Sequence, residues 1–414
     1  MDDENASCAH DGEEYAQLLS LLRLPVEIFL HICSFLDAST LVHGLSLVCT
    51  RFYLILRDES LWKARIDHIW PNASHSLLRP EKPDKLFWMS SCVAIEKQIA
   101  LWKQQDSMVK LRNINPYYIR SVLLMHDETA CVGATWTTLF YWKLPSREEC
   151  CDEIGNTGYI RVGNDESIRD LTAIDNTIYC CIRGCSSDRV RTWMLTNTGF
   201  VHQKTYEIEI FNVMSWLTCV SSCPERAVFA TGSKYGIYVF DSRSSNYPIY
   251  KYRPHTEDVT KLAMNTEYIL SASLDGTVAV WDQRAGRIMK SITFPGEAYP
   301  GCMNMRRDWV CIGDSKAKLH MLDPKNDFEL VKSYSTEHTA SITGVRLTHG
   351  SLITSSIDGT VRISSLTDPP RSIATLRSKF ETILSMDYMN DTLAISSLGI
   401  EIWRPKLTCS TKYQ

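Results

Sequence analysis

The segment SASLDGTVAVWD, from Ser271 to Asp282, is the clearest structural pattern in this chain of 414 residues. An Asp275-Gly276 pair lies between two short runs rich in β-branched and small residues, which predicts two antiparallel strands joined by a tight hairpin. A single hairpin of this kind leaves apolar faces uncovered, so the pattern predicts further copies elsewhere in the chain.

Together with the upstream His255, this segment resembles a WD repeat, the four-stranded blade of a β-propeller. Aromatic or apolar residues recur at the Trp281 position at intervals of roughly 40 to 50 residues, as expected for such blades. The seven positions are Trp142, Trp193, Phe240, Trp281, Leu322, Ser364 and Trp403. The chain is therefore predicted to be mainly β, with a seven-bladed propeller over residues 108–405.

WD repeats contain a buried hydrogen-bonded set made of a loop His, a strand Ser or Thr, a turn Asp and the Trp. The fourth blade would supply His255, Ser271 or Ser273, Asp275 and Trp281, and the sixth would supply His338, Ser355 or Ser356, and Asp358. Ser364 stands in place of the sixth Trp, whereas the seventh blade keeps Trp403. We interpret these residues as structural, because buried polar groups need partners.

The last blade lacks sequence for an outer strand, because Trp403 lies close to the end of the chain. The strand-like segment 109–112 can supply that strand and join the first and last blades. Closing the ring in this way removes both open sheet edges.

Residues 18–66 have a helical apolar period in place of the strand pattern. Pro25 can begin a helix, Asp37 or Ser39 can cap a second helix that runs to Leu56, and Asp58 or Ser60 can begin a third. Three short helices form a core that is too small to be stable alone. The spacing of Leu24-Pro25, Glu27, Ile32, Phe35-Leu36-Asp37, Leu41, Val48-Cys49 and Leu61-Trp62 resembles the F-box motif.

An F-box followed by a WD propeller is similar to the F-box/WD-repeat family of ubiquitin ligase substrate receptors. The resemblance implies that the F-box docks on a Skp-type adaptor, which links it to a cullin scaffold. The residues expected at that contact are Leu24, Pro25, Glu27, Ile28, Ile32, Leu36, Leu41, Val48, Cys49, Leu61 and Trp62. The alternative is an ordinary three-helix subdomain that packs on the propeller.

Residues 67–107 are predicted to form a linker followed by a spacer helix. Trp88, Cys92, Ile95, Ile99 and Trp102 recur at three- and four-residue steps, which predicts one apolar stripe along that helix. The stripe favours intramolecular packing between the two domains over pairing with a second copy of the chain.

Related propellers hold phosphate with basic residues that follow the apolar residue at the start of each inner strand. Here only Arg120, after Ile119, and Arg169, after Ile168, are basic at those positions. These two arginines are the candidate substrate-binding residues, although a pair falls short of the arginine ring of phosphodegron readers.

Composition and motifs exclude several function classes. The net charge of −4 is unlike that of a nucleic-acid-binding protein. None of the common nucleophile, phosphate-loop or zinc-protease motifs occurs, so no catalytic residue is predicted and the chain is not expected to be an enzyme. The 15 cysteines lack close C-x-x-C pairs, so neither a metal nor another cofactor is expected and most thiols should be buried and free.

The acidic residues 1–17 are predicted to form a disordered tail, and residues 406–414 a C-terminal tail. No signal peptide or apolar run of about 18 residues occurs, which predicts a soluble cytoplasmic protein without membrane contact, its nuclear share left open.

Two functions remain. The first is a non-catalytic receptor subunit of an SCF-type (Skp-cullin-F-box) ubiquitin ligase, whose propeller binds the protein to be ubiquitinated. The second is a WD-repeat scaffold that assembles partners without ubiquitin transfer. The sequence names neither the substrate nor any modification that recognition requires, and it leaves the oligomeric state open.

Overall fold

The computed structural model describes residues 24–70, 86–103 and 108–405, apart from 115–116, 126–129, 146–153, 155–156, 186, 209–215, 245, 295–297, 307–308 and 349. The tails predicted at 1–17 and 406–414 lie outside the described residues. The chain divides into two compact units, residues 1–100 and 101–414.

The first unit is helical. Its elements are α2 (Val26–Ser34), α3 (Ala38–His43), the 3-10 turn η2 (Leu45–Leu47), α4 (Thr50–Leu56), α5 (Glu59–Ile69) and most of α6 (Phe87–Lys103). Pro25 precedes α2, and the Asp37 carboxylate caps α3 by accepting from the Thr40 amide. Phe29 stacks on Phe52, which fixes α2 against α4 inside a small core.

The second predicted helix is wrong in its extent, because the segment from Ala38 to Leu56 contains two helices. The chain turns at Gly44, where an added Cβ would meet the Thr40 carbonyl oxygen at 2.8 Å. A new helix then begins at Thr50, with Cys49 as its N-cap residue. A glycine inside a helical pattern often marks a helix end, and here it does so.

Helix α6 is joined to the other helices of the first unit by the carboxylate of Glu96. One oxygen of Glu96 accepts from the backbone amide of Ala38 at 2.6 Å, and the other lies 2.5 Å from Nε of Arg65. The Arg65 guanidinium also donates to the carbonyl oxygen of Cys33. One ion pair thus connects α6 with α5 and with the start of α3. Cys92 and Ile95 of the predicted stripe are fully buried.

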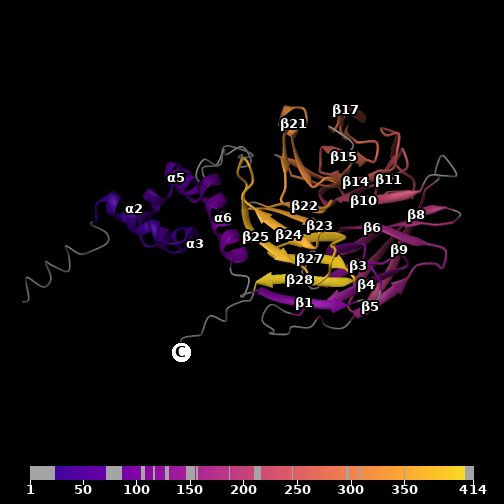
Figure 1. Cartoon of the computed structure of the whole chain (residues 1–414), viewed down its shortest axis with the longest axis horizontal. Coiled ribbons are helices and arrows are strands. Elements are labelled where there is room, and N and C mark those ends of the chain that lie inside the picture. Colours follow the sequence, from indigo (N-terminus) through magenta and orange to yellow (C-terminus); the bar gives the residue numbers. More distant parts are fainter. Residues whose placement is uncertain are drawn as a thin grey trace, which may run out of the picture. The chain divides into compact units, whose positions relative to one another are not determined.

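The second unit contains seven four-stranded antiparallel sheets, which confirms the predicted seven-bladed propeller (Figure 1). The first three blades are β2 (Ser121–Leu124), β3 (Ala130–Ala134), β4 (Thr138–Lys143) and β5 (Thr157–Arg161); β6 (Ser167–Ile174), β7 (Thr177–Arg183), β8 (Asp188–Thr196) and β9 (Gly199–Ile208); and β10 (Leu217–Cys223), β11 (Val228–Ser233), β12 (Ile237–Asp241) and β13 (Tyr250–Tyr252).

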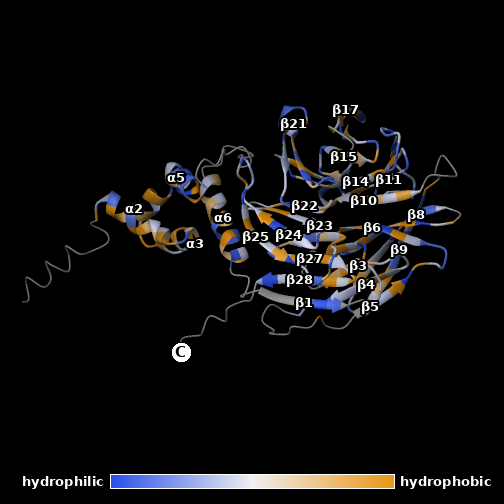
Figure 2. Ribbon diagram, viewed as in Figure 1, coloured by the Kyte–Doolittle hydropathy of each residue, from blue (hydrophilic) through white to orange (hydrophobic). Residues whose placement is uncertain are grey.

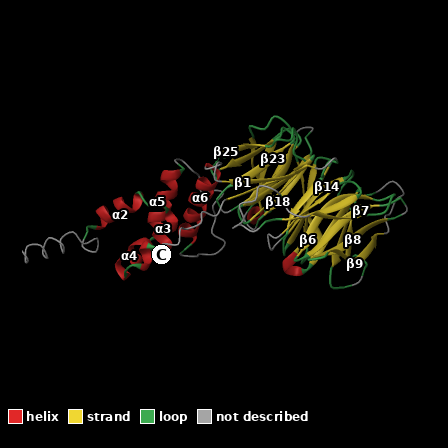
Figure 3. Cartoon of the chain, turned by 90° about the horizontal axis from the view of Figure 1, so that it is seen from below, coloured by secondary structure: helices red, strands yellow, loops and turns green. Residues whose placement is uncertain are grey.

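The fourth to seventh blades follow the same order. They are β14 (Val259–Met264), β15 (Tyr268–Ser273), β16 (Thr277–Asp282) and β17 (Arg287–Thr293); β18 (Pro300–Met305), β19 (Val310–Asp314), β20 (Lys318–Asp323) and β21 (Glu329–Ser335); β22 (Ile342–Leu347), β23 (Leu352–Ser356), β24 (Thr360–Ser364) and β25 (Ser372–Arg377); and β26 (Ser385–Met389), β27 (Thr392–Ser397) and β28 (Gly399–Pro405), completed by β1 (Met108–Ile114). Figure 3 shows these sheets with short loops between their strands.

Strand β1 closes the ring, as the sequence predicts. It pairs with β28 along its whole length, from Met108 opposite Pro405 to Ile114 opposite Gly399. The ion pair between Arg112 and the fully buried Glu401 lies on this strand pair. The last blade therefore takes its outer strand from residues almost 300 positions earlier in the chain.

The cores of the propeller lie between neighbouring blades. Trp403 of blade seven packs with Val361 and Leu376 of blade six, and Trp102 at the end of α6 belongs to the same cluster of the second unit. Within the described residues, no helix is long and apolar enough to cross a membrane.

Candidate functional site

The first unit carries several large apolar side chains that its own helices leave in solvent. The most exposed are Phe35, Leu47, Leu54 and Val48, which retain between 64% and 77% of their accessible surface. Val26, Ile28 and Tyr53 add smaller exposed areas. Figure 2 shows hydrophobic segments on α2 and α3. Apolar side chains gathered on so small a unit are typical of a surface that another protein covers.

The structure separates the predicted adaptor contacts into three groups. Pro25, Glu27, Ile28 and Val48 are exposed, and Leu24, Ile32, Leu36, Cys49 and Leu61 are half-buried. Leu41 and Trp62 are buried almost completely. Sequence reasoning included Phe35 in the motif but did not place it, or Leu47 and Leu54, at the contact. Leu47 and Leu54 lie off the apolar stripe of their segment, which is the signal that could have found them.

Leu41 and Trp62 are corrections to the predicted contact surface, because both side chains belong to the core of the first unit. The Trp62 indole Nε1 donates to the carbonyl oxygen of Leu56 at 2.7 Å, so its polar atom is also satisfied internally. These two residues hold the helices together and do not offer surface to a partner in this conformation.

Arg120 and Arg169 come together on the propeller, although they belong to neighbouring blades. Both guanidinium groups stack on the exposed Trp136, whose ring centroid lies 4.0 Å from Arg120 and 4.8 Å from Arg169. The backbone joins the same blades here, since the Ile168 amide donates to the Trp136 carbonyl oxygen at 2.6 Å. The cation–π geometry holds both arginines in place over one indole.

A third arginine extends this group. Arg183, at the end of β7, stacks on Trp216 at 4.3 Å. Arg183 lies opposite Ser167, two residues before Arg169, on the strand paired with β6. Burial and the positive charges of Arg183 and Arg120 lower the pKa of Arg169. None of the three forms an ion pair within the described residues, and the Nε atom of Arg169 is buried without a hydrogen-bond partner. We call Arg120, Trp136, Arg169, Arg183 and Trp216 the Arg–Trp cluster.

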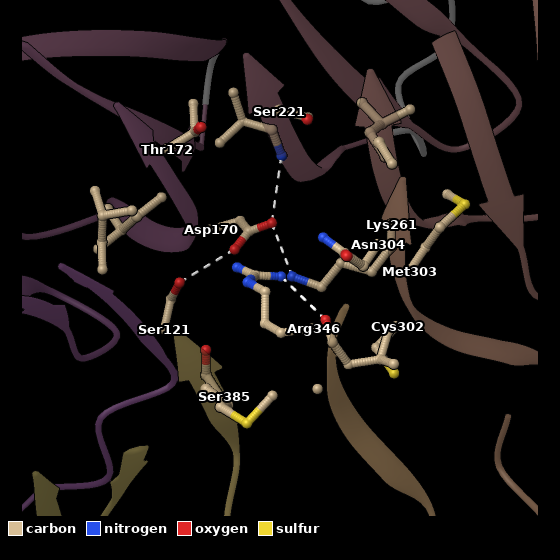
Figure 4. Close-up of a pocket in the computed structure, with 18 of the residues that line it drawn as sticks. Ser121, Asp170, Thr172, Ser221, Lys261, Cys302, Met303, Asn304, Arg346 and Ser385 are labelled. Carbon is tan, nitrogen blue, oxygen red and sulfur yellow. Dashed lines mark hydrogen bonds and ion pairs between the residues drawn. The ribbon is translucent and has the colours of Figure 1, made fainter. Parts of the chain in front are cut away.

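The central channel differs from this cluster because its charges are paired (Figure 4). A cavity of about 250 Å³ lies between the first strands of the blades. Asp170 there pairs with Lys261 at 2.9 Å and accepts from Ser121, while Arg346 pairs with Asp387 at 3.0 Å. These pairs connect blades across the channel and leave little uncompensated charge for a ligand.

The histidine of blade four lies where the WD-repeat resemblance places it. His255 Nε2 is 2.8 Å from Ser271 Oγ, and His255 Nδ1 is 3.1 Å from a carboxylate oxygen of Asp275. Trp281 does not take part, because its buried Nε1 has no hydrogen-bond partner. The indole instead stacks on Tyr252 of blade three. Thr277 takes the fourth place, because its hydroxyl lies 3.0 Å from His255 Nδ1 and donates to Asp275, so the network stands beside a stacked tryptophan.

Blade six has the same network with a different strand residue. His338 Nδ1 lies 3.0 Å from Asp358, and His338 Nε2 lies 2.9 Å from Thr354 Oγ1. The expected partners Ser355 and Ser356 are wrong: Ser355 lies on the opposite face of β23, and Ser356 Oγ donates to the carbonyl oxygen of Ala340.

A related network in blade five was missed by sequence reasoning. His320 there lies on strand β20 and bonds Asp314 and Ser333. Its histidine is inside a strand, so the search for a loop His before the blade could not find it.

No group of three or more His, Cys, Asp or Glu residues within the described part of the chain could hold a metal ion. The described cysteines are all free, and all but Cys49 and Cys185 are buried. Burial raises the pKa of the Cys92 and Cys219 thiols to about 12, so these groups stay protonated near neutral pH.

Comparison with known proteins gives two family matches. The F-box-like family model matches residues 21–66, and the WD domain, G-beta repeat, model matches residues 246–282. The second match includes His255 and Trp281, and the remaining blades are visible in the structure.

Several known proteins are similar to the chain over most of its length. Human F-box/WD repeat-containing protein 9 is 28% identical over 93% of this chain and 82% of its own length. The Bos taurus protein of the same name is 27% identical over the same shares. F-box/WD repeat-containing protein mec-15 of Caenorhabditis elegans is 23% identical over 77% of this chain and 79% of its own length. The chain thus joins an F-box-like domain to a WD-repeat propeller, which is the domain combination of the F-box/WD-repeat proteins.

Proposed function

We propose that this chain is the substrate-recognition subunit of an SCF-type ubiquitin ligase. Its F-box docks on a Skp-type adaptor linked to a cullin, and its propeller binds the protein to be ubiquitinated. The chain contributes proximity and orientation, and other subunits transfer ubiquitin. The observation that carries the proposal is the exposed apolar surface of the first unit, formed by Phe35, Leu47, Val48 and Leu54.

The first unit is small and helical. Trp62, Phe29 and Phe52 fill its core, yet Phe35, Leu47, Val48 and Leu54 face solvent. Burial of apolar area contributes about 25 cal/mol per Å², so covering four such side chains supplies a large driving force for association.

The Arg–Trp cluster is the proposed contact for the substrate. None of the three arginines forms an ion pair with a described carboxylate, although the negative charge of Asp188 acts on Arg169 and Arg183. The cluster therefore favours an acidic group on the bound protein, because charge-assisted hydrogen bonds to guanidinium are the strong ones. Stacking on Trp136 and Trp216 restricts the arginines before binding and so reduces the entropy that association costs.

The adaptor contact is tested by affinity capture of the full-length chain from cells, with partners identified by mass spectrometry. Leu47→Asp combined with Val48→Asp places charge on the exposed surface without removing a core residue. Ile288→Asp, on the exposed outer strand of blade four, is the matched control. We expect adaptor and cullin with the wild-type chain and with the control, and loss of both with the double variant.

The substrate contact is tested in the same experiment with Arg120→Glu combined with Arg169→Glu. This variant should keep adaptor and cullin but lose a subset of the other partners, which are the candidate substrates. Capture of neither adaptor nor cullin by the wild-type chain would contradict the receptor role. Partners that remain under those conditions would favour the scaffold function.

A further inference from the structure

The side chain at the Trp281 position of a blade packs against the outer strand of the preceding blade. Trp281 stacks on Tyr252 of β13, with ring centroids 4.1 Å apart and planes 15° apart. Phe240 contacts Tyr206 of β9, the outer strand of its preceding blade, edge to face at 5.4 Å. Trp403 shares a core cluster with Leu376 of β25. An apolar side chain at this position therefore fills the space between two neighbouring blades.

Blade six has Ser364 at this position. Its register shows the equivalence, because Ser364 lies opposite Leu352 in the hairpin of blade six, as Trp281 lies opposite Ile269 in blade four. The outer strand of blade five presents Tyr334 there, opposite Leu319, as blade three presents Tyr252 opposite Ile237. The two aromatic walls thus correspond, but the ring that stacks on Tyr334 is missing.

A cavity of about 280 Å³ lies in the place of this ring. Tyr334, Leu319, Leu352 and Ser364 line it from blades five and six, and Pro369 lies at its edge. Pro369 and the neighbouring Ser333 and Ser335 are exposed, so the cavity opens to solvent. The Tyr334 hydroxyl donates to Asp368 at 2.8 Å, which restricts the orientation of the ring that forms the wall.

The arginine that lines the cavity also favours an aromatic ligand. Arg362, on the same face of β24 as Ser364, has a buried Nε atom without a hydrogen-bond partner. Its guanidinium is held by an ion pair with Glu337. Thr354 also lines the cavity, but its hydroxyl is already engaged by His338. A planar ring in this space would stack on Tyr334 and lie beside a guanidinium that prefers aromatic faces.

We infer that this cavity between blades five and six binds a tryptophan side chain of a polypeptide partner. The indole would occupy the volume that Trp281 fills in blade four, with Tyr334 as the stacking surface. A buried aromatic anchor in a preformed pocket is a frequent centre of binding energy in protein interfaces. The choice of a polypeptide ligand rests on the proposed receptor role, whereas the preference for an indole rests on the cavity alone.

The indole site is tested on the full-length chain with N-acetyl-L-tryptophanamide as the probe. Ligand-observed NMR is suitable because the tryptophans of the chain mask a fluorescence signal. We expect saturable binding with a dissociation constant on the order of a millimolar, and at least tenfold weaker binding of N-acetyl-L-leucinamide. Absence of saturable binding, or equal binding of the two probes, would overturn the inference.

Ser364→Trp supplies the missing ring from within the chain. It should lower probe affinity at least tenfold and raise the melting temperature. The control Ser291→Trp, on the exposed strand β17, should leave probe affinity within about twofold and the melting temperature within about two degrees of wild type. Should Ser364→Trp fail to fold, Ser364→Leu is measured with the same expectation. Unchanged probe affinity in a folded variant contradicts the site.

The polypeptide part has its own readout in affinity capture. Ser364→Trp should lose at least one partner that Ser291→Trp retains, with adaptor and cullin unchanged. If no partner is lost, the polypeptide assignment is wrong even when the probe binds. Probe binding does not involve the adaptor, so failure of the receptor role and failure of this site give different results.

Discussion

The ion pair between Arg112 and Glu401 lies where the propeller ring closes, and its removal has a calculable cost. Arg112 Nε is 2.5 Å from Glu401 Oε1, and the Ser378 hydroxyl donates to Oε2 at 2.9 Å. The Glu401 side chain is completely buried, whereas that of Arg112 keeps 31% of its exposure. Arg112→Met removes the guanidinium but retains most of the aliphatic stem, so Glu401 remains as a buried charge.

Removing one partner of a buried ion pair costs about 3–5 kcal/mol of unfolding free energy. Because Ser378 still donates to Glu401 and because Arg112 is partly exposed, we expect about 2–3 kcal/mol for Arg112→Met. The double variant Arg112→Met with Glu401→Leu has no stranded charge. It should therefore recover most of the loss, since apolar replacement of a complete buried pair is often nearly neutral.

The assay is urea unfolding of the full-length chain, followed by circular dichroism, for wild type, both single variants and the double variant. A double-mutant cycle then isolates the coupling energy between the two side chains. Lys63→Met in the exposed pair with Glu59 is the control and should change the free energy of unfolding by less than about 0.5 kcal/mol. The reasoning is refuted if Arg112→Met unfolds within about 0.5 kcal/mol of wild type, or if the double variant is as unstable as the single one.

Three further predictions concern acidity, thiols and a turn. Burial lowers the pKa of His255 and His338. Burial raises the pKa of Asp358, but hydrogen bonds, chiefly from Thr360, outweigh burial and lower the pKa to about 2. The free energy of unfolding should therefore fall as pH drops below about 6.5 and again below about 4, and a urea midpoint at pH 5.5 equal to that at pH 7.5 would contradict the histidine part. Iodoacetamide should modify the exposed Cys185 before the buried Cys131, Cys180 and Cys219 in the native protein, as timed mass spectrometry can check; early labelling of Cys180 would be inconsistent with the core. Gly359→Ala should destabilise blade six by about 2–3 kcal/mol, because φ is +74° and the new Cβ would meet the Glu381 carbonyl oxygen at 2.8 Å. The control Gly286→Ala, at φ +65° with nothing within 4 Å of the new Cβ, should cost about 1 kcal/mol in the same unfolding assay. Equal costs of the two substitutions would contradict the clash at Gly359.

The parts of the fold that depend on local sequence were predictable. The Asp275-Gly276 turn and the strands beside it fix one hairpin, and repetition of the Trp281 position counts the blades. The pairing of β1 with β28 was also predictable, because the last blade lacks an outer strand and the strand-like segment before the first blade can supply it.

Partner choice inside a blade was harder to predict, because it depends on the register of one strand. Sequence reasoning chose Ser355 or Ser356 for His338, whereas Thr354 faces the histidine. A shift by one residue moves a side chain to the opposite face of the sheet, so the run of three hydroxyl residues from Thr354 to Ser356 does not identify the correct one.

The binding surfaces were harder still, because they depend on contacts between distant segments. Arg183 lies on β7 opposite Ser167 of β6, so it comes near Arg169 only through the register of this strand pair, and both arginines meet Arg120 through the packing of neighbouring blades. Helical periodicity identified the apolar residues of the F-box but not which of them face solvent. Leu41 proved to be in the core and Leu47 in solvent, since Gly44 divides the expected helix between them.

The pairing of β1 with β28 also sets an order of events during synthesis. β1 emerges from the ribosome before every blade, and its partner emerges after all of them. Throughout that interval its hydrogen-bonding edge is open to neighbouring nascent chains and to chaperones. Without β28 the propeller would have six complete sheets and an unclosed ring, so its folding and its quality-control fate depend on the strand that pairs with β1.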